Sequence, residues 1–137
     1  MMKVDIQALI PQREPIIMVD RLDKVEHAYA ETSLEIRPDN FFVAPDGRLE
    51  EAGIIEHIAQ SALAFAGYWA LQAGASEPPV GYIGEVKKFH CYRCPQTGEI
   101  LHTRITIEAE AEGITLVRGE TSGNGTLVAD TQMKISI

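Results

Sequence analysis

The stretch "GIIEHIAQSALAFAGYWAL", Gly53 to Leu71, decides the fold, because it is the longest helical pattern of apolar residues in the chain. The sequence "GASEPPVG" that follows it is a strong helix breaker. The spacing predicts one helix at about residues 53–72. Its first turns carry Glu56, His57 and Gln60, which are costly to remove from water unless a partner or a ligand pairs with them.

A helical wheel divides this segment into two halves. The polar half carries His57, Gln60 and Ser61 but no lysine, arginine or aspartate, and Glu56 lies at the boundary. One interpretation is a solvated flank on which Glu56 favours the helix dipole. The other is a flank that contacts another surface. The apolar half, predicted to pack on a sheet, comprises Ile55, Ile58, Ala59, Ala62, Leu63, Phe65, Ala66, Trp69 and Ala70.

Most of the remaining chain has the alternating or apolar pattern of β-strands. The four segments after the helix predict a four-strand antiparallel meander. One helix among strands predicts an α+β fold in a single domain, residues 1–137, with one curved antiparallel sheet of five to six strands wrapped around the helix. The predicted strand segments are 15–26, 27–38, 82–93, 100–112, 114–122 and 126–137.

Composition and charge restrict the function. The 137 residues carry a net charge of −8, which disfavours binding to nucleic acids and to anionic membranes. No apolar run is long enough to span a membrane or to form the core of a signal peptide, so we expect a soluble, cytoplasmic protein. Cys91 and Cys94 lie in a predicted strand, which favours two reduced thiols over a redox or metal site. The sequence contains no metal-binding pattern or phosphate-binding loop, and we expect no cofactor.

Several segments in the same order resemble the 3-hydroxyacyl-ACP dehydratases of type II fatty acid synthesis. Glu56 and Ala59-Gln60 match the central helix of that family, "LIPQREPIIMVDRL" resembles its opening, and "GYIGEVKKFHCYRCPQTGE" resembles its next strand and turn. The resemblance implies a hot-dog fold and an acyl carrier protein thioester as substrate. It also implies a homodimer or higher oligomer, or a heteromer with a homologous dehydratase.

One difference concerns catalysis. The family carries its catalytic histidine in a loop before the helix, whereas "NFFVAPDGRLEEAG" contains none and places Phe42 there. The chain resembles a divergent branch found with pigment and aryl-polyene type pathways. The resemblance implies Glu56 as the catalytic carboxylate, the Gly53 amide as a donor to the thioester carbonyl, and Gln60 as the group that orients Glu56. The predicted substrate-contacting residues are Phe42, Gly53, Ile54, His57 and Gln60.

The missing histidine leaves the base unassigned. His57 is nearest, but it points about 100° away from Glu56 on a helix; His90 lies in a strand, and His27 and His102 occupy surface positions. Three functions therefore remain: a dehydratase or hydratase with altered acid–base groups, a non-catalytic acyl-binding subunit of a complete dehydratase, and a hot-dog thioesterase in which the carboxylate activates water.

Docking of an acidic carrier protein requires a local basic patch on this acidic chain. Lys87, Lys88 and Arg93 lie in one strand segment and are the predicted patch, with Arg13 and Arg48 as further candidates. The alternative is that these side chains are scattered charges that maintain solubility.

Overall fold

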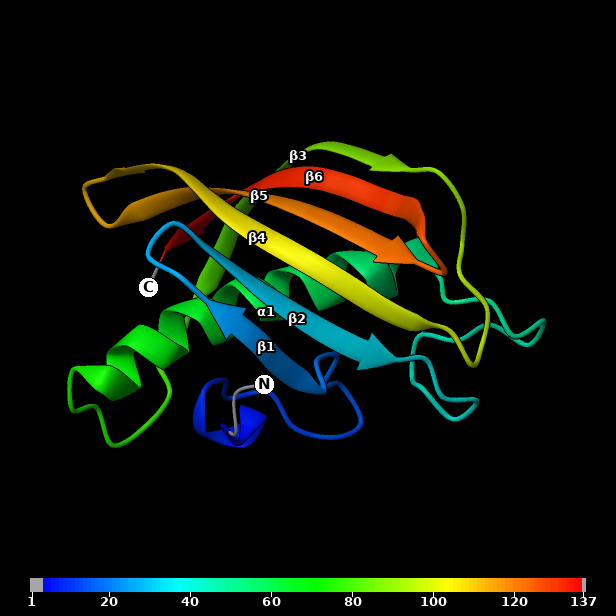
Figure 1. Ribbon diagram of the computed structural model, residues 1–137, viewed down its shortest axis with the longest axis horizontal. Helices are drawn as coiled ribbons and strands as arrows, with labels where there is room; N and C mark the ends of the chain where they lie inside the picture. The colour runs from blue at the N-terminus through cyan, green and yellow to red at the C-terminus, as the bar shows by residue number, and fades with distance from the viewer. Residues whose placement is uncertain (1–3, 137) are drawn as a thin grey trace.

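The computed structural model describes residues 4–136 and consists of a six-stranded antiparallel sheet and one long helix (Figure 1). This confirms the predicted α+β architecture. Along the sheet the strand order is β1-β2-β4-β5-β6-β3. The elements are a 3-10 helix η1 (Ile6–Ala8), β1 (Arg21–Val25), β2 (Tyr29–Glu35), α1 (Glu51–Gln72), β3 (Tyr82–Cys91), β4 (Ile100–Ala111), β5 (Ile114–Gly123) and β6 (Thr126–Ser136).

The predicted four-strand meander is wrong, because β3 pairs with β6 at the far edge of the sheet and not with β4. Only β4, β5 and β6 follow one another as hairpins. Their turns contain Glu112-Gly113 and Asn124-Gly125, all with positive φ, as tight two-residue hairpin turns require. The loop between β3 and β4 is longer, and this length lets the chain cross from one part of the sheet to another (Figure 1).

The helix begins at Glu51, two residues before the predicted start, and its most deeply buried side is the polar one. His57, Gln60 and Ser61 are all fully buried. The predicted core half is only partly buried: Trp69 is 40% exposed and Ile55, Ala66 and Ala70 are half-buried, whereas the remaining members lie in the core as predicted, namely Ile58, Ala59, Ala62, Leu63 and Phe65. The prediction of the buried side was therefore wrong for Trp69 and the half-buried residues.

The N-terminal segment explains this burial, since it covers one side of α1 while the sheet covers another (Figure 1). Gly67 permits the close approach: a Cβ at this position would overlap the Leu9 carbonyl group. Residues 16–19, predicted to form a strand, instead lie extended along the helix without a strand partner. Their backbone is held by helix side chains, for example where the Met18 N–H donates to Gln60.

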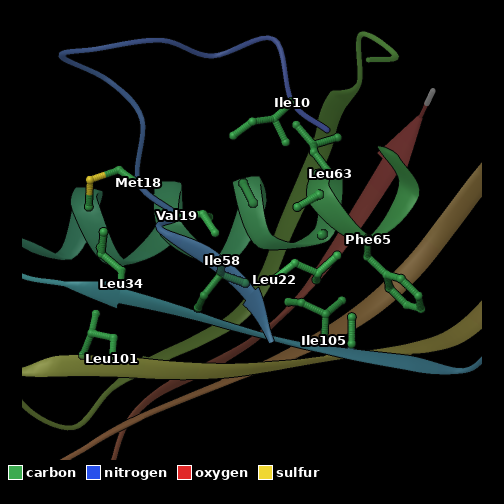
Figure 2. Packing of buried hydrophobic residues seen from close by; sticks show 14 of the residues in the cluster. Ile10, Met18, Val19, Leu22, Leu34, Ile58, Leu63, Phe65, Leu101 and Ile105 are labelled. Atoms are coloured by element: carbon green, nitrogen blue, oxygen red, sulfur yellow. The ribbon is translucent and has the colours of Figure 1, made fainter. Parts of the chain in front are cut away.

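The core lies between α1 and the sheet. Ile58 and Phe65 project from the helix toward the strands that carry Leu22 and Ile105, whereas Leu63 lies beside Ile10 of the N-terminal segment (Figure 2). A side chain at Gly119 of β5 would come within contact distance of Ile58, so the helix and the sheet lie close together there. Within residues 4–136, no helix is long and apolar enough to cross a membrane.

Candidate functional site

Glu56 is half-buried in the second turn of α1 and is oriented by Gln60 one turn later. The Gln60 Nε2 donates to the Glu56 Oε2 at 2.8 Å and to the Ile16 carbonyl oxygen at 2.9 Å. The Gln60 Oε1 accepts the Met18 N–H at 2.6 Å. This confirms that Gln60 bonds to Glu56. Among residues 4–136, Glu56 has no other hydrogen-bond partner, so its second carboxyl oxygen remains free for a ligand.

His57 has a structural position and no access to a substrate. Its Nδ1 lies 2.7 Å from the Met18 carbonyl oxygen and its Nε2 lies 2.7 Å from the Thr103 hydroxyl. Because a carbonyl only accepts, Nδ1 carries the proton and Nε2 accepts from Thr103, which in turn contacts Thr121 at 2.6 Å. Burial, partly offset by the bond to Met18, lowers the pKa of His57 to about 4. Because His57 is buried and both ring nitrogens are bonded, we do not include it among the proposed substrate contacts.

The Gly53 amide, which was expected to donate to the thioester carbonyl, is already bonded within the chain. The Gly53 N–H donates to the Glu50 carbonyl at 2.9 Å, and the Ile54 N–H reaches the same oxygen at 3.2 Å. These amides are therefore not free to bind substrate, and the Ile54 side chain is fully buried. The amides of Glu51 and Ala52 precede the first intrahelical bond and are the donors that remain in this turn.

Phe42 packs against this turn within the same chain. A Cβ at Gly53 would lie 2.5 Å from the Phe42 Cβ, so the glycine is what permits the approach. The Phe42 carbonyl accepts the Glu50 N–H at 3.0 Å, and its ring meets Phe41 edge-to-face. Phe42, which the resemblance aligns with the family's catalytic histidine, thus packs against the first turn of α1.

The other histidines lie away from Glu56. His90 bonds to Asp130 at 3.0 Å on the exposed side of the sheet, and His102 is also exposed. His27 stacks on Trp69, thirteen residues or about 20 Å along α1 from Glu56. Within the described chain, no histidine is placed to act as a base beside Glu56.

Cys91 offers no nucleophile at neutral pH. Cys91 and Cys94 are free thiols, and the Cys91 Sγ donates to the Arg93 carbonyl oxygen at 3.3 Å. Burial, reinforced by the neighbouring Cys94, raises the pKa of Cys91 to about 11. Since the thiolate is the reactive form, Cys91 is protonated and inert.

The basic residues predicted to form a docking patch are two lysines of β3 and an arginine that is held in an ion pair. Lys88 is exposed and Lys87 half-buried, at a β-bulge where Lys88 adopts a positive φ of 49°. Arg93 makes a two-fold ion pair with Glu99, at 3.0 and 2.8 Å, and donates to the Gly123 carbonyl oxygen at 2.7 Å. The hydrogen bonds from Arg93 lower the pKa of Glu99. Arg93 therefore connects Glu99 to the end of β5, and we do not include it in the proposed docking patch.

The further basic candidates, Arg13 and Arg48, differ in how firmly their guanidinium groups are held. Arg13 donates to the carbonyl oxygens of Gln7, Ile10 and Gln12, which fixes its guanidinium against the N-terminal segment. Arg48 is exposed and lies 3.8 Å from Asp46. Both residues are exposed, but the Arg13 guanidinium is held by these three hydrogen bonds.

Solved structures with a similar architecture identify the fold of the chain. The Dehydratase Heterocomplex ApeI:P from Xenorhabdus doucetiae superimposes with a TM-score of 0.91 at 16% identity, covering 98% of this chain and 91% of the other. A hypothetical thioesterase from Streptococcus pneumoniae, solved with coenzyme A, gives a TM-score of 0.65 at 9% identity and covers 85% and 83%. These similarities show the fold, which is the expected hot-dog fold with a central helix.

Sequence comparison identifies the family to which the chain belongs. The chain is 28% identical over 136 residues to the 3-hydroxyacyl-[acyl-carrier-protein] dehydratase FabZ of Syntrophotalea carbinolica, across 96% of this chain and 90% of the relative. Residues 4–136 match the ApeP-like family, described as ApeP dehydratase. The protein belongs to this family of dehydratase-like hot-dog proteins, as the resemblance in its helix had indicated.

Proposed function

We propose that this chain is a subunit of a 3-hydroxyacyl-thioester dehydratase and contributes Glu56 as the general acid, while a homologous partner chain contributes the base. One observation supports this proposal above all. Glu56 is oriented by Gln60 and keeps one oxygen free, yet none of the histidines in the described chain is positioned to act beside it.

The chemistry requires two groups. A base removes a proton from Cα of the 3-hydroxyacyl thioester, and an acid protonates the hydroxyl on Cβ, which leaves as water as the double bond forms. Glu56 supplies the second proton transfer. The amides of Glu51 and Ala52 at the start of α1 polarise the thioester carbonyl. The site is therefore complete except for the base.

The comparisons support both the substrate class and the partner. The FabZ relative is named for 3-hydroxyacyl-[acyl-carrier-protein] substrates, and the most similar fold reported above is that of a dehydratase heterocomplex. From these names we infer a carrier-bound acyl thioester and a pairing with a homologous dehydratase. A homodimer would contain two copies of Phe42 and no base, so we expect it to be inactive.

The free edge of β3 supports such a pairing. This strand lies at the end of the sheet, and Tyr82 is 67% exposed there. Val80, Ile83 and Val86 are also exposed in the same segment. An unpaired edge that carries apolar side chains invites a second strand. Two irregularities, one between Ile83 and Glu85 and one at the Lys88 bulge, limit regular pairing to short stretches of β3.

Dehydration assays on the purified chain, alone and mixed with a histidine-containing homologous dehydratase, test the proposal. The substrate is a 3-hydroxyacyl-carrier thioester. We expect no turnover by the chain alone, turnover by the mixture, and a loss of at least about 100-fold for Glu56→Gln in the mixture. The matched control is Glu77→Gln, which changes an exposed carboxylate in the loop after the helix.

Other outcomes separate the alternatives. If Glu56→Gln leaves the activity of the mixture unchanged, the chain is a non-catalytic acyl-binding subunit. Turnover by the chain alone would contradict the need for a partner base. Release of free thiol from a saturated acyl thioester, abolished by Glu56→Gln, would instead identify a thioesterase.

The carrier protein is proposed to dock at Lys87 and Lys88, with Arg48 as a further contact. These side chains are accessible, whereas Arg93 is held by Glu99. The double variant Lys87→Glu with Lys88→Glu should weaken carrier binding at low salt. Unchanged affinity under those conditions would place the docking surface elsewhere.

A further inference from the structure

The backbone of Met18 is held from both sides by side chains of α1. Its N–H donates to the Gln60 Oε1 at 2.6 Å, and its carbonyl oxygen lies 2.7 Å from the His57 Nδ1. Met18 belongs to the extended segment that passes beside the helix and leads into β1 (Figure 2). All three residues are fully buried, where hydrogen bonds are stronger than in water. Two helix side chains therefore fix the position of one residue outside the helix.

The direction of each hydrogen bond on the sheet side follows from its partners. The Nδ1 of His57 carries the proton that it donates to Met18, so its Nε2 accepts from the Thr103 hydroxyl of β4. Thr103 has one hydroxyl hydrogen and gives it to His57. The 2.6 Å contact between Thr103 and Thr121 of β5 is therefore a bond that Thr121 donates. His57 thus bridges the sheet and the N-terminal segment and is fixed at both ring nitrogens.

The direction is also fixed between Met18 and Glu56. Because the Met18 N–H only donates, Gln60 presents its carbonyl oxygen to it and has its NH₂ group free for other acceptors. One hydrogen of this group is donated to the Ile16 carbonyl oxygen at 2.9 Å and the other to the Glu56 Oε2 at 2.8 Å. The Oε2 of Glu56 is therefore an acceptor. A proton that Glu56 delivers to a substrate is carried on its Oε1.

We propose that His57 is a positioning residue for Glu56. It fixes the Met18 backbone, which fixes the Gln60 amide, and this amide fixes the carboxyl group. Thr103 sets the orientation of the His57 ring, and we call Thr103, His57, Met18 and Gln60 the positioning network. This inference rests on the proposed function, because it takes Glu56 as the general acid. Proton transfer depends steeply on position, and a displacement of about 1 Å can lower the rate about 100-fold.

Two substitutions at residue 57 separate positioning from packing. His57→Leu fills the space with an apolar side chain and leaves the Met18 carbonyl oxygen without its donor, whereas His57→Asn keeps a donor there. Both variants lose the acceptor for Thr103. In the mixture with a histidine-containing homologous dehydratase, we expect His57→Leu to lower kcat at least about tenfold with little change in KM. His57→Asn should recover most of this loss.

Two threonine substitutions provide a matched comparison. Thr103→Val releases the His57 ring, and Thr32→Val removes a similarly buried hydroxyl that contacts Ser61 at 2.7 Å, outside the positioning network. Both should lower stability in urea denaturation, because each removes a buried hydrogen bond. We expect kcat to fall for Thr103→Val, to return with Thr103→Ser, and to stay within about twofold of the original for Thr32→Val. If His57→Leu does not fold, this comparison decides the question.

A further measurement requires no turnover. The chain is isotopically labelled for NMR and mixed with the unlabelled partner, and the NH₂ signals of Gln60 are identified through the aliphatic protons of the same side chain. Both hydrogens should exchange slowly with solvent, since each is bonded within the protein. His57→Leu should accelerate this exchange, whereas Thr32→Val should leave it unchanged.

Opposite results would overturn the positioning role of His57. These are equal losses of kcat for Thr103→Val and Thr32→Val, equal losses for His57→Leu and His57→Asn, or Gln60 signals that His57→Leu leaves unchanged. If no mixture dehydrates the substrate, the proposed function is refuted instead. The exchange of the Gln60 hydrogens then decides alone whether the positioning network holds the Glu56 carboxyl group.

Discussion

Acidification should destabilise this fold through His57, and the size of the effect follows from its burial. The side chain is fully buried and its pKa is lowered from 6.5 to about 4, so the folded protein holds it neutral while the unfolded chain protonates it first. The unfolded state binds more protons between these two values, and stability therefore falls as the pH falls. The contribution of His57 is fully present above pH ~6.5.

The linkage between protonation and folding gives the size of this loss of stability. With these two pKa values, the loss from His57 alone is about 2 kcal/mol by pH ~5 and about 3 kcal/mol by pH ~4. Such a loss is a substantial part of the 5–15 kcal/mol, roughly, that stabilises a typical domain. As the pH falls below the ordinary pKa of a glutamate, the fold should lose further stability, because Arg93 lowers the pKa of Glu99 in the folded state and the unfolded chain is protonated there first.

The assay is urea denaturation followed by circular dichroism from pH ~7 to pH ~4, at one fixed protein concentration because association changes apparent stability. The comparison is His57→Asn, whose amide can still donate to the Met18 carbonyl but does not titrate. We expect this variant to be less stable at neutral pH by about 1–3 kcal/mol, because the bond from Thr103 is lost. Its stability should decline less with acid, and an equal decline in both proteins would refute the assignment.

Three further substitutions test particular contacts. Gly67→Ala should destabilise the protein by roughly 1–3 kcal/mol in thermal or urea denaturation, because the added methyl group meets the Leu9 carbonyl, and no change would contradict the close approach. Phe42→His should give measurable dehydration by the chain without a partner if the remaining site is intact; continued inactivity would indicate that the ring position is unsuitable for a base. Glu99→Gln should lower the melting temperature because it leaves Arg93 without its carboxylate, and an unchanged value would show that the pair contributes nothing measurable.

The sequence predicted those features that depend on local spacing. The pairing of Glu56 with Gln60 follows from residues four apart on one helix, and the hydrogen bond between them is present. The alternation of buried residues in β4 was equally visible, since Leu101, Thr103 and Ile105 all face the core.

Features that depend on distant partners were not predictable in this way. The polar side of α1 is buried because His57 bonds to Met18 and Thr103. These partners lie 39 and 46 residues away in the chain, so local spacing does not reveal them. The same applies to residues 16–19, whose apolar pattern suits a strand although their backbone bonds to Gln60. The position of β3 depends on how a long loop crosses the sheet, and local patterns contain no information about that path.

Under the proposed pairing, the exposed edge of β3 makes the supply of this chain relative to the partner important for the cell. An unpaired strand with Tyr82 and Val86 in solvent can join other strands as readily as the correct one. Chains made in excess would therefore be prone to aggregation and open to degradation. We expect balanced synthesis of the two subunits to matter for yield, so that the chain accumulates in soluble form when it is co-expressed with its partner and poorly when it is produced alone.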